Sequence, residues 1–217
     1  MKPYIITDPG SCHMGRMDLA TELVDVSKDC GADAVKFQLF PKCMAGRNVW
    51  LDPAMFSDLV MYGKEKRIEV FASVFDEGTY EVVANRCASI KFSFSSPIKH
   101  LVQNACNDPR LSRVYVSSDT LTRPKIQSDK LLNLYCIPLY PVPYVIDFST
   151  ELLHGFDGFS DHTLGIRQAI AAVGAGAAII EKHLRLDNPA CDGCPDGAFA
   201  IRPRQLRPLV TTFKYGN

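Results

Sequence analysis

Residues 156–183, FDGFSDHTLGIRQAIAAVGAGAAIIEKH, carry the pattern that decides the fold of this chain. A short apolar run ends at SDH (160–162), a helix-period segment covers 164–175, and a second apolar run ends at EKH (181–183). A strand, a helix and a strand in this order normally form two parallel strands joined by a right-handed crossover. Both strands then end at the same edge of the sheet, where α/β proteins keep their functional sites.

Polar side chains are predicted to meet at that edge. Side chains alternate between the two faces of a strand, so Ser160 shares a face with His162, and Glu181 shares one with His183. Because neighbouring strands lie ~4.8 Å apart, the two imidazoles can reach one divalent ion. We expect both histidines to be exposed at the strand ends. The alternative is that both are structural, each hydrogen-bonded at the end of its strand.

The composition is that of a globular protein with no strongly charged partner. Lys plus Arg equals Asp plus Glu, at 24 each, so the chain offers no basic field for nucleic acid or an anionic membrane. No apolar run is long enough for a membrane span. The opening MKPYIITDPG fits a first strand better than a signal peptide. We therefore expect a cytoplasmic protein.

Most of the eight cysteines sit in apolar runs, where a free thiol behaves as a small hydrophobic residue. With no secretory signal, a reducing compartment and free thiols are expected. Cys191 and Cys194 form a lone CxxC in a loop rich in proline and glycine. That pair is either incidental or has a redox or zinc role, and it lacks the second pair that a zinc site needs.

Apolar runs and helix-period segments alternate along the whole chain. Strict alternation implies a parallel sheet, and eight units favour closure into a TIM (β/α)8 barrel over an open sheet. We expect one compact domain over residues 1–217. The expected strands are 4–7, 34–38, 70–74, 89–92, 113–117, 132–136, 157–160 and 178–181; the expected helices are 17–30, 53–66, 77–86, 97–107, 123–130, 146–154, 164–175 and 202–215.

The expected strands carry cations and hydroxyls at or near their ends. A lysine that points into a barrel mouth is unfavourable unless an anion meets it, and phosphate accepts many hydrogen bonds beside positive charge. Lys36 could instead extend to the rim, and each serine could simply belong to a turn. Their convergence favours an anion cradle formed by Lys36, Ser73, Lys91, Ser117 and Ser160.

Six motifs carry a family resemblance that spans nearly the whole chain. They are ITDPGSCHMG (6–15), GADAVKFQ (31–38), VFASVFD (70–76), YPVP (140–143), SDHTLG (160–165) and IEKH (180–183). Together they resemble the N-acetylneuraminate (sialic acid) synthase family, which includes the legionaminate and pseudaminate synthases. The pairing of SDHTLG with IEKH is the most specific signal, and it indicates the chemistry better than the sugar.

The resemblance implies a TIM barrel that condenses phosphoenolpyruvate with an open-chain N-acylated aldose, giving a nonulosonic acid and phosphate. It implies a divalent ion, Mn²⁺ before Mg²⁺ or Co²⁺, and leaves a homo-oligomer open. Carried over by motif, the metal ligands would be His162 and His183. Phosphoenolpyruvate would be held by the five-residue cradle named above, and the sugar would face Gln38, Tyr140 and Asp196. Catalytic roles would fall to Asp8, Lys91 and Glu181.

Several positions depart from the family pattern. Asp8 stands where the family has Glu, Cys12 and Met14 stand where it has Asn, and Phe94 and Ser96 replace a serine and a glutamate. The loop after Gln38 is shorter than usual, and we expect no C-terminal antifreeze-like domain. Two hypotheses follow: a compact phosphoenolpyruvate-dependent synthase whose acceptor differs from N-acetylmannosamine, or a barrel without turnover that serves as a binding or structural protein.

Overall fold

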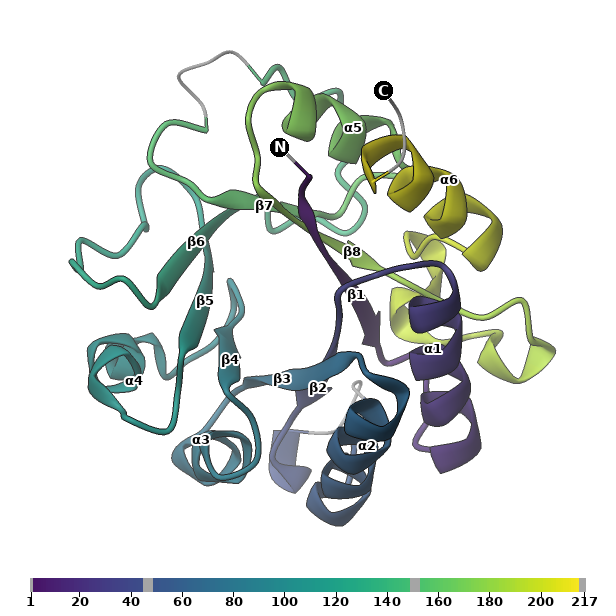
Figure 1. Cartoon of the computed structure of the whole chain (residues 1–217), viewed down its shortest axis with the longest axis horizontal. Coiled ribbons are helices and arrows are strands. Elements are labelled where there is room, and N and C mark those ends of the chain that lie inside the picture. Colours follow the sequence, from purple (N-terminus) through teal and green to yellow (C-terminus); the bar gives the residue numbers. More distant parts are fainter. Residues whose placement is uncertain (1, 45–48, 149–152, 215–217) are drawn as a thin grey trace.

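The computed structural model describes residues 2–44, 49–148 and 153–214. Its eight strands are all parallel and close into a barrel in sequence order, with each strand bonded to the next and β8 bonded to β1 (Figure 1). The TIM-barrel prediction is therefore confirmed. The strands are β1 (Tyr4–Gly10), β2 (Ala34–Leu39), β3 (Glu69–Val74), β4 (Ser89–Phe92), β5 (Arg113–Ser118), β6 (Leu131–Cys136), β7 (Gly158–Asp161) and β8 (Ile179–His183).

The helices lie outside the ring of strands (Figure 1). The three helices expected before residue 90 all form. Pro53 starts α2 behind the capping carboxylate of Asp52, and Asp76 and Thr79 form a capping box on α3. The α-helices are α1 (Met17–Asp29), α2 (Pro53–Lys66), α3 (Glu77–Ala84), α4 (Val102–Asn107), α5 (Arg167–Gly174) and α6 (Pro203–Lys214).

Two predicted helices do not form as expected. Residues 123–130, between β5 and β6, are irregular, and this prediction was wrong. Pro124 and the turn formers Ser128 and Asp129 leave that segment without a continuous apolar stripe. Of the predicted helix 146–154, residues 146–148 are irregular and 153–154 form a turn, while 149–152 lie outside the described residues. No α-helix is therefore described between β5 and β7, on the β6 side of Figure 1.

Strand register brings the motif residues to one end of the barrel. Ser160 lies opposite Glu181, and Asp161 lies opposite Lys182, so the SDH and EKH ends run side by side. On the other side of β8, Asp8 lies opposite His183. Alternation on β2 turns Lys36 toward the barrel interior, while Val35 and Phe37 join the apolar layer beneath the helices.

No helix of the described residues is long and apolar enough to cross a bilayer.

Candidate active site

Four buried charged side chains meet at the carboxyl end of the barrel. Lys36 Nζ lies 2.6 Å from Asp8 Oδ2 and 3.4 Å from Glu181 Oε2, and Lys91 Nζ lies 3.1 Å from both oxygens of Glu181. Ser160 Oγ donates to Glu181 Oε1 at 2.7 Å. All four charged side chains are at most 3% exposed. We call Asp8, Lys36, Lys91 and Glu181 the charged quartet.

Two cations and two anions balance the charge of the quartet. Burial opposes the charge of Lys36, but Asp8 and Glu181 more than offset this and raise its pKa. Burial also disfavours the Glu181 carboxylate, yet Lys36 and Lys91 hold its pKa below the usual range. For Lys91 burial outweighs the attraction of Glu181, so its pKa is lowered. Each lysine therefore meets an anion, but that anion belongs to the protein. The alternative in which Lys36 extends to the rim is wrong.

His162 and His183 lie next to the quartet with ring centroids 5.5 Å apart. Both are buried, at 4% and 3% exposure, with the rings of Tyr140 and Phe199 packed against them, so the expectation of exposed strand-end histidines was wrong. His162 Nδ1 lies 3.0 Å from the Ile137 carbonyl, and burial lowers the pKa of His162 to about 3. A neutral His162 that donates from Nδ1 keeps the lone pair of its other ring nitrogen free.

The donor set suits a metal held by two imidazoles. His183 Nε2 lies 3.2 Å from Asp8 Oδ2, whereas its Nδ1 is buried with no hydrogen-bond partner. An unpartnered ring nitrogen and a neutral neighbouring imidazole are what a transition ion takes as ligands. No group of three or more His, Cys, Asp or Glu side chains in the described ranges has metal-binding geometry. A metal here would thus need non-protein ligands, as at catalytic sites that keep open positions.

A small inner cavity lies against the quartet. Its volume is about 20 Å³, enough for roughly one water molecule. Phe94 forms part of its wall, and the ammonium of Lys99 lies 4.7 Å from the centroid of the Phe94 ring. The lining comprises Asp8, Lys36, Gln38, Ser93, Phe94, Ser117, Cys136, Tyr140, Ser160, His162, Glu181 and His183.

An outer cavity of about 340 Å³ opens from the same residues toward solvent. It shares Gln38, Ser93, Tyr140 and His183 with the inner cavity. Phe40 and Phe75 stack in its wall with ring centroids 4.0 Å apart. The remaining lining residues are Ser95, Pro195, Asp196, Ala198 and Phe199. The two cavities form one funnel with a charged floor and a partly aromatic mouth.

The structure brings most of the sequence-predicted site residues to this funnel. Ten of the twelve line one of the two cavities, and the other two, Ser73 and Lys91, do not. Ser73 is fully buried, and its hydroxyl lies 3.5 Å from the Phe37 carbonyl. The Lys91 ammonium donates to both carboxylate oxygens of Glu181 and acts on the funnel through that carboxylate.

Several lining residues were absent from the sequence-based candidates, among them Phe199 and Cys136. Phe199 packs against His183 at 4.8 Å and His162 at 6.2 Å between ring centroids. Cys136 lines the inner cavity, and burial raises its pKa to about 12. Ser93 lines both cavities and has a buried hydroxyl without a partner. In the segment KFSFSS (91–96) the sequence does point to Ser93 or Ser95 as the replacement for the hydrogen-bond donor that Phe94 lacks, whereas nothing in the sequence marks Phe199.

Asp196 reaches the funnel from the loop between β8 and α6. Its Oδ2 accepts from the backbone N–H and the hydroxyl of Ser11, at 2.5 and 2.6 Å. A Cβ on Gly10, whose φ is +53°, would lie 2.3 Å from that oxygen. Glycine is therefore required at position 10 both for the backbone conformation and for the approach of Asp196.

His13, in the same motif, is a buried structural histidine. Its Nδ1 accepts from the Gly15 N–H at 3.0 Å, and its Nε2 is buried without a partner. Burial lowers its pKa to about 4.

Stability should fall as the pH is lowered from 6.5 to 4, because the unfolded chain then protonates His13 while the folded chain does not. The expected loss is on the order of 3 kcal/mol. Urea unfolding at pH 7 and pH 4.5 measures it. His13→Gln should remove its share of the pH dependence and leave the share of the buried His162, whereas the exposed control His100→Gln should leave the dependence unchanged; an equal pH slope in wild type and His13→Gln would contradict this account.

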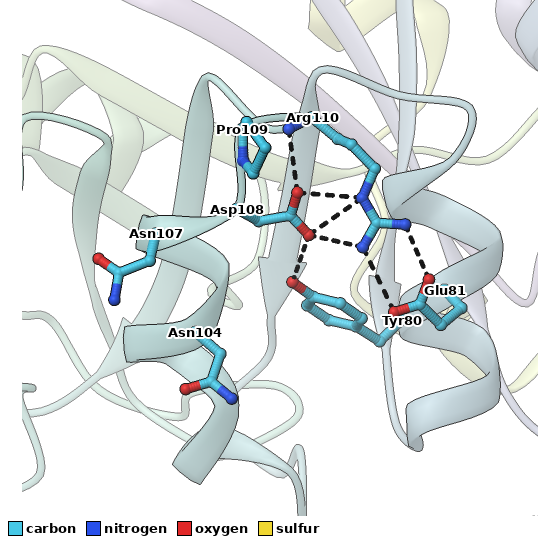
Figure 2. A pocket seen from close by; sticks show the side chains of 7 residues that line it. All are labelled: Tyr80, Glu81, Asn104, Asn107, Asp108, Pro109 and Arg110. Carbon is cyan, nitrogen blue, oxygen red and sulfur yellow. Dashed lines mark hydrogen bonds and ion pairs between the residues drawn. The ribbon is translucent and has the colours of Figure 1, made fainter.

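A larger hollow lies elsewhere, at the amino end of the barrel (Figure 2). Its volume is about 570 Å³. Two of the residues that line it, Asp108 and Arg110, come from the loop that enters β5. Arg110 bonds to Asp108 and Glu81, and Tyr80 donates to Asp108 at 2.9 Å. These side chains satisfy one another, and the active sites of TIM barrels lie at the opposite, carboxyl end of the strands. The candidate site is therefore the funnel.

Comparison with known proteins agrees with the fold and the motifs. The NeuB family model matches residues 42–215. An N,N'-diacetyllegionaminic acid synthase of Legionella pneumophila is 30% identical over 99% of this chain and 72% of its own length. The spore coat polysaccharide biosynthesis protein SpsE of Bacillus subtilis is 28% identical over 95% of this chain, which spans only 65% of that protein.

Solved structures give the same answer for the fold. The crystal structure of an N-acetylneuraminic acid synthetase from Leptospira borgpetersenii, in complex with citrate, superimposes with a TM-score of 0.82. It is 24% identical and covers 99% of this chain and 83% of the other. With the family model spanning most of the sequence, and with the shared barrel and motifs, the chain belongs to the NeuB family.

Proposed function

We propose that this chain condenses phosphoenolpyruvate with an N-acylated aldose, giving a nonulosonic acid and inorganic phosphate. The observation that carries the proposal is the charged quartet, buried beside two imidazoles at the floor of the funnel. Burying four charged groups together is unfavourable for folding alone, so a site of this kind indicates function. The names of the relatives, which are synthases of legionaminic and neuraminic acids, support the same reaction.

Phosphoenolpyruvate would bind at the charged floor. Lys36 and Lys91 supply positive charge, and the hydroxyls of Ser117, Ser160 and Ser93 can donate to phosphate or carboxylate oxygens. Ser93 suits this role because its buried hydroxyl faces the funnel without a partner. It stands next to Phe94, whose ring cannot donate a hydrogen bond. The inner cavity is too small for the whole ligand, so side chains must shift on binding.

The balanced charge of the quartet has a consequence for affinity. Asp8 and Glu181 already neutralise Lys36 and Lys91. The attraction of an incoming anion to the two lysines is therefore offset by its repulsion from the two carboxylates. A divalent ion at His162 and His183 would supply positive charge next to the anion and would polarise the aldehyde oxygen of the acceptor. We propose Mn²⁺ for this role, with Mg²⁺ or Co²⁺ as alternatives. Metal and phosphoenolpyruvate should then strengthen each other's binding equally.

The residues of the funnel suit the bond changes of the condensation. C3 of phosphoenolpyruvate attacks the aldehyde carbon, which leaves a developing positive charge at C2. The carboxylates of Asp8 and Glu181 can stabilise that charge electrostatically. Water then adds at C2 with loss of a proton, and phosphate departs with its negative charge beside Lys36. Tight packing around the quartet would fix the relative positions of the reactants.

The acceptor sugar would lie in the outer cavity. Gln38, Tyr140 and Asp196 offer hydrogen bonds there, and the stacked Phe40 and Phe75 offer an apolar wall for an acyl group. Ser96, which replaces a family glutamate, does not line the cavity but donates to the Val74 carbonyl at 2.8 Å. With that carboxylate missing, we propose an acceptor other than N-acetylmannosamine. We also propose that the barrel binds phosphoenolpyruvate without a further domain.

Phosphate release from phosphoenolpyruvate, with Mn²⁺ and a panel of N-acylated aldoses, tests the function. Aldose-dependent release that requires the metal would support the synthase. Phosphoenolpyruvate binding by calorimetry without release for any aldose would favour the second hypothesis, a binding protein on the same barrel. Failure to bind phosphoenolpyruvate at millimolar concentration, with and without Mn²⁺, would rule out both.

His162→Ala and His183→Ala should each abolish stoichiometric Mn²⁺ binding, because two imidazoles are the only expected protein ligands. Calorimetric titration with Mn²⁺ measures this directly. Each histidine is buried, so thermal melts must show that the variant is folded. His154→Ala, at an exposed position that lines neither cavity, is the control. Unchanged Mn²⁺ affinity in either folded variant would show that these histidines are structural.

A further inference from the structure

Two cysteines from distant parts of the chain lie in direct contact beside the funnel. Cys12 is in the turn that follows β1, and Cys194 is in the loop between β8 and α6. Their sulfur atoms are 2.7 Å apart, although 182 positions separate them in sequence. Non-bonded carbon atoms settle at ~3.5–4.0 Å, and sulfur is larger, so this contact is unusually close. All eight cysteines are free thiols in the structure.

The backbone around the pair is held in register. Ser11 bonds to Asp196 through its N–H and its hydroxyl, and the Asp196 N–H lies 3.3 Å from the Ser11 hydroxyl oxygen. Each of these residues lies one or two positions from a cysteine of the pair. The two sulfurs need to approach by only about 0.7 Å to reach covalent distance.

The two thiols differ in their surroundings in a way that suits oxidation. Cys12 is fully buried, whereas Cys194 is 6% exposed. The hydrogen bond from the Cys12 thiol and the nearby guanidinium of Arg185 lower the pKa of Cys194. The same hydrogen bond, together with burial, raises the pKa of Cys12. Thiolates are the reactive form of cysteine, so Cys194 is the nucleophile and Cys12 holds the proton.

We propose that Cys12 and Cys194 form a reversible disulfide bond that ties the end of β1 to the loop carrying Asp196. With a peroxide as oxidant, the Cys194 thiolate attacks one oxygen and becomes a sulfenic acid, while the other oxygen leaves as water. The Cys12 sulfur then attacks the Cys194 sulfur, the S–S bond forms, and the hydroxyl leaves with the Cys12 proton as a second water. Two thiols lose two electrons, and the peroxide is reduced.

The bond would fix one wall of the funnel. Residues 195–199 follow Cys194 directly and supply four of the lining residues of the outer cavity. Cys191, fully buried, is the competing partner within the CxxC pair. The N–H of Cys194 bonds to the Cys191 carbonyl at 3.3 Å, but no close contact is described between their sulfurs. The geometry therefore favours Cys12 over Cys191.

Oxidation of the purified chain with hydrogen peroxide, followed by non-reducing peptide mapping, tests the proposal. The expected product is a single peptide pair joined between Cys12 and Cys194, with the loss of two titratable thiols, reversed by dithiothreitol. Because the bond closes a loop of more than 100 residues, the melting temperature of the oxidised chain should rise by roughly 5–15 °C.

Matched variants separate this bond from other oxidation. Cys12→Ser and Cys194→Ser should lose both the crosslink and the rise in melting temperature. Cys43→Ser, which removes an exposed thiol, should keep both. Direct mapping of the wild-type chain needs no variant, so the test survives if one fails to fold. A Cys191–Cys194 bond, or no crosslink between Cys12 and Cys194, would overturn the proposal. None of these readouts depends on turnover or on phosphoenolpyruvate binding.

Discussion

Replacing Lys36 with methionine is expected to weaken phosphoenolpyruvate binding by roughly 100-fold. Lys36 is the cation that bridges Asp8 and Glu181, at 2.6 and 3.4 Å. Without it the floor of the funnel carries a net negative charge, which repels an anionic ligand. A hydrogen bond to a charged group contributes ~1.5–3 kcal/mol, and 1.4 kcal/mol corresponds to a factor of ten in affinity. Calorimetric titration with phosphoenolpyruvate and Mn²⁺ measures the loss.

A folding defect must be separated from a binding defect, because Lys36→Met leaves buried carboxylates poorly compensated. The double variant Lys36→Met with Asp8→Asn restores the charge balance of the quartet. It should regain thermal stability, yet its affinity for phosphoenolpyruvate should stay low. Lys64→Met, at an exposed position of α2, is the control and should bind normally. Wild-type affinity in folded Lys36→Met would remove Lys36 from the proposed site.

The second large effect is on folding. Lys182→Met is expected to lower the free energy of unfolding by about 3–5 kcal/mol, the usual loss when one partner of a buried ion pair is removed. Lys182 Nζ lies 3.0 Å from Asp161 Oδ2, and both side chains are fully buried. The other oxygen of Asp161 accepts from the N–H and the hydroxyl of Thr163, at 2.8 and 2.7 Å. The methionine would leave the Asp161 carboxylate uncompensated.

Each residue of this pair directly precedes one histidine of the motifs. Asp161 precedes His162 on β7, and Lys182 precedes His183 on β8, so the pair holds the two strand ends together on the face opposite the funnel. Urea unfolding measures the change. Asp18→Ala, which breaks the exposed Arg16–Asp18 pair, is the control and should have no measurable effect. A change in Lys182→Met below about 1 kcal/mol would show that the pair is dispensable.

The two motifs thus combine two roles that alternate along each strand. In SDH and EKH, Ser160, Glu181 and the histidines face the funnel, while Asp161 and Lys182 face the outer layer. The period of two along a strand predicts this separation from sequence. It does not predict that the outer pair is an ion pair, because that depends on the register between β7 and β8.

Local sequence determined the strands well and the helices less well. All eight strands lie within three residues of their expected bounds, because each is a short apolar run bounded by polar or turn residues. The predicted helix 123–130 failed because its apolar residues are too sparse to form a stripe, and the barrel closes across β5 and β6 without it. The parallel pairing of neighbouring strands, not the crossover helix, maintains the ring there.

The sequence alone predicts the barrel and puts the candidate site residues at the carboxyl ends of the strands, and ten of these twelve residues line the funnel. Strand alternation and the parallel crossover are properties of short segments, so a single sequence shows them. Three features appear only in the folded barrel: Lys36 bridges Asp8 and Glu181, the histidines are buried, and Cys12 touches Cys194. These contacts join residues far apart in the chain. Their distances follow from barrel closure and loop packing, which no local pattern encodes.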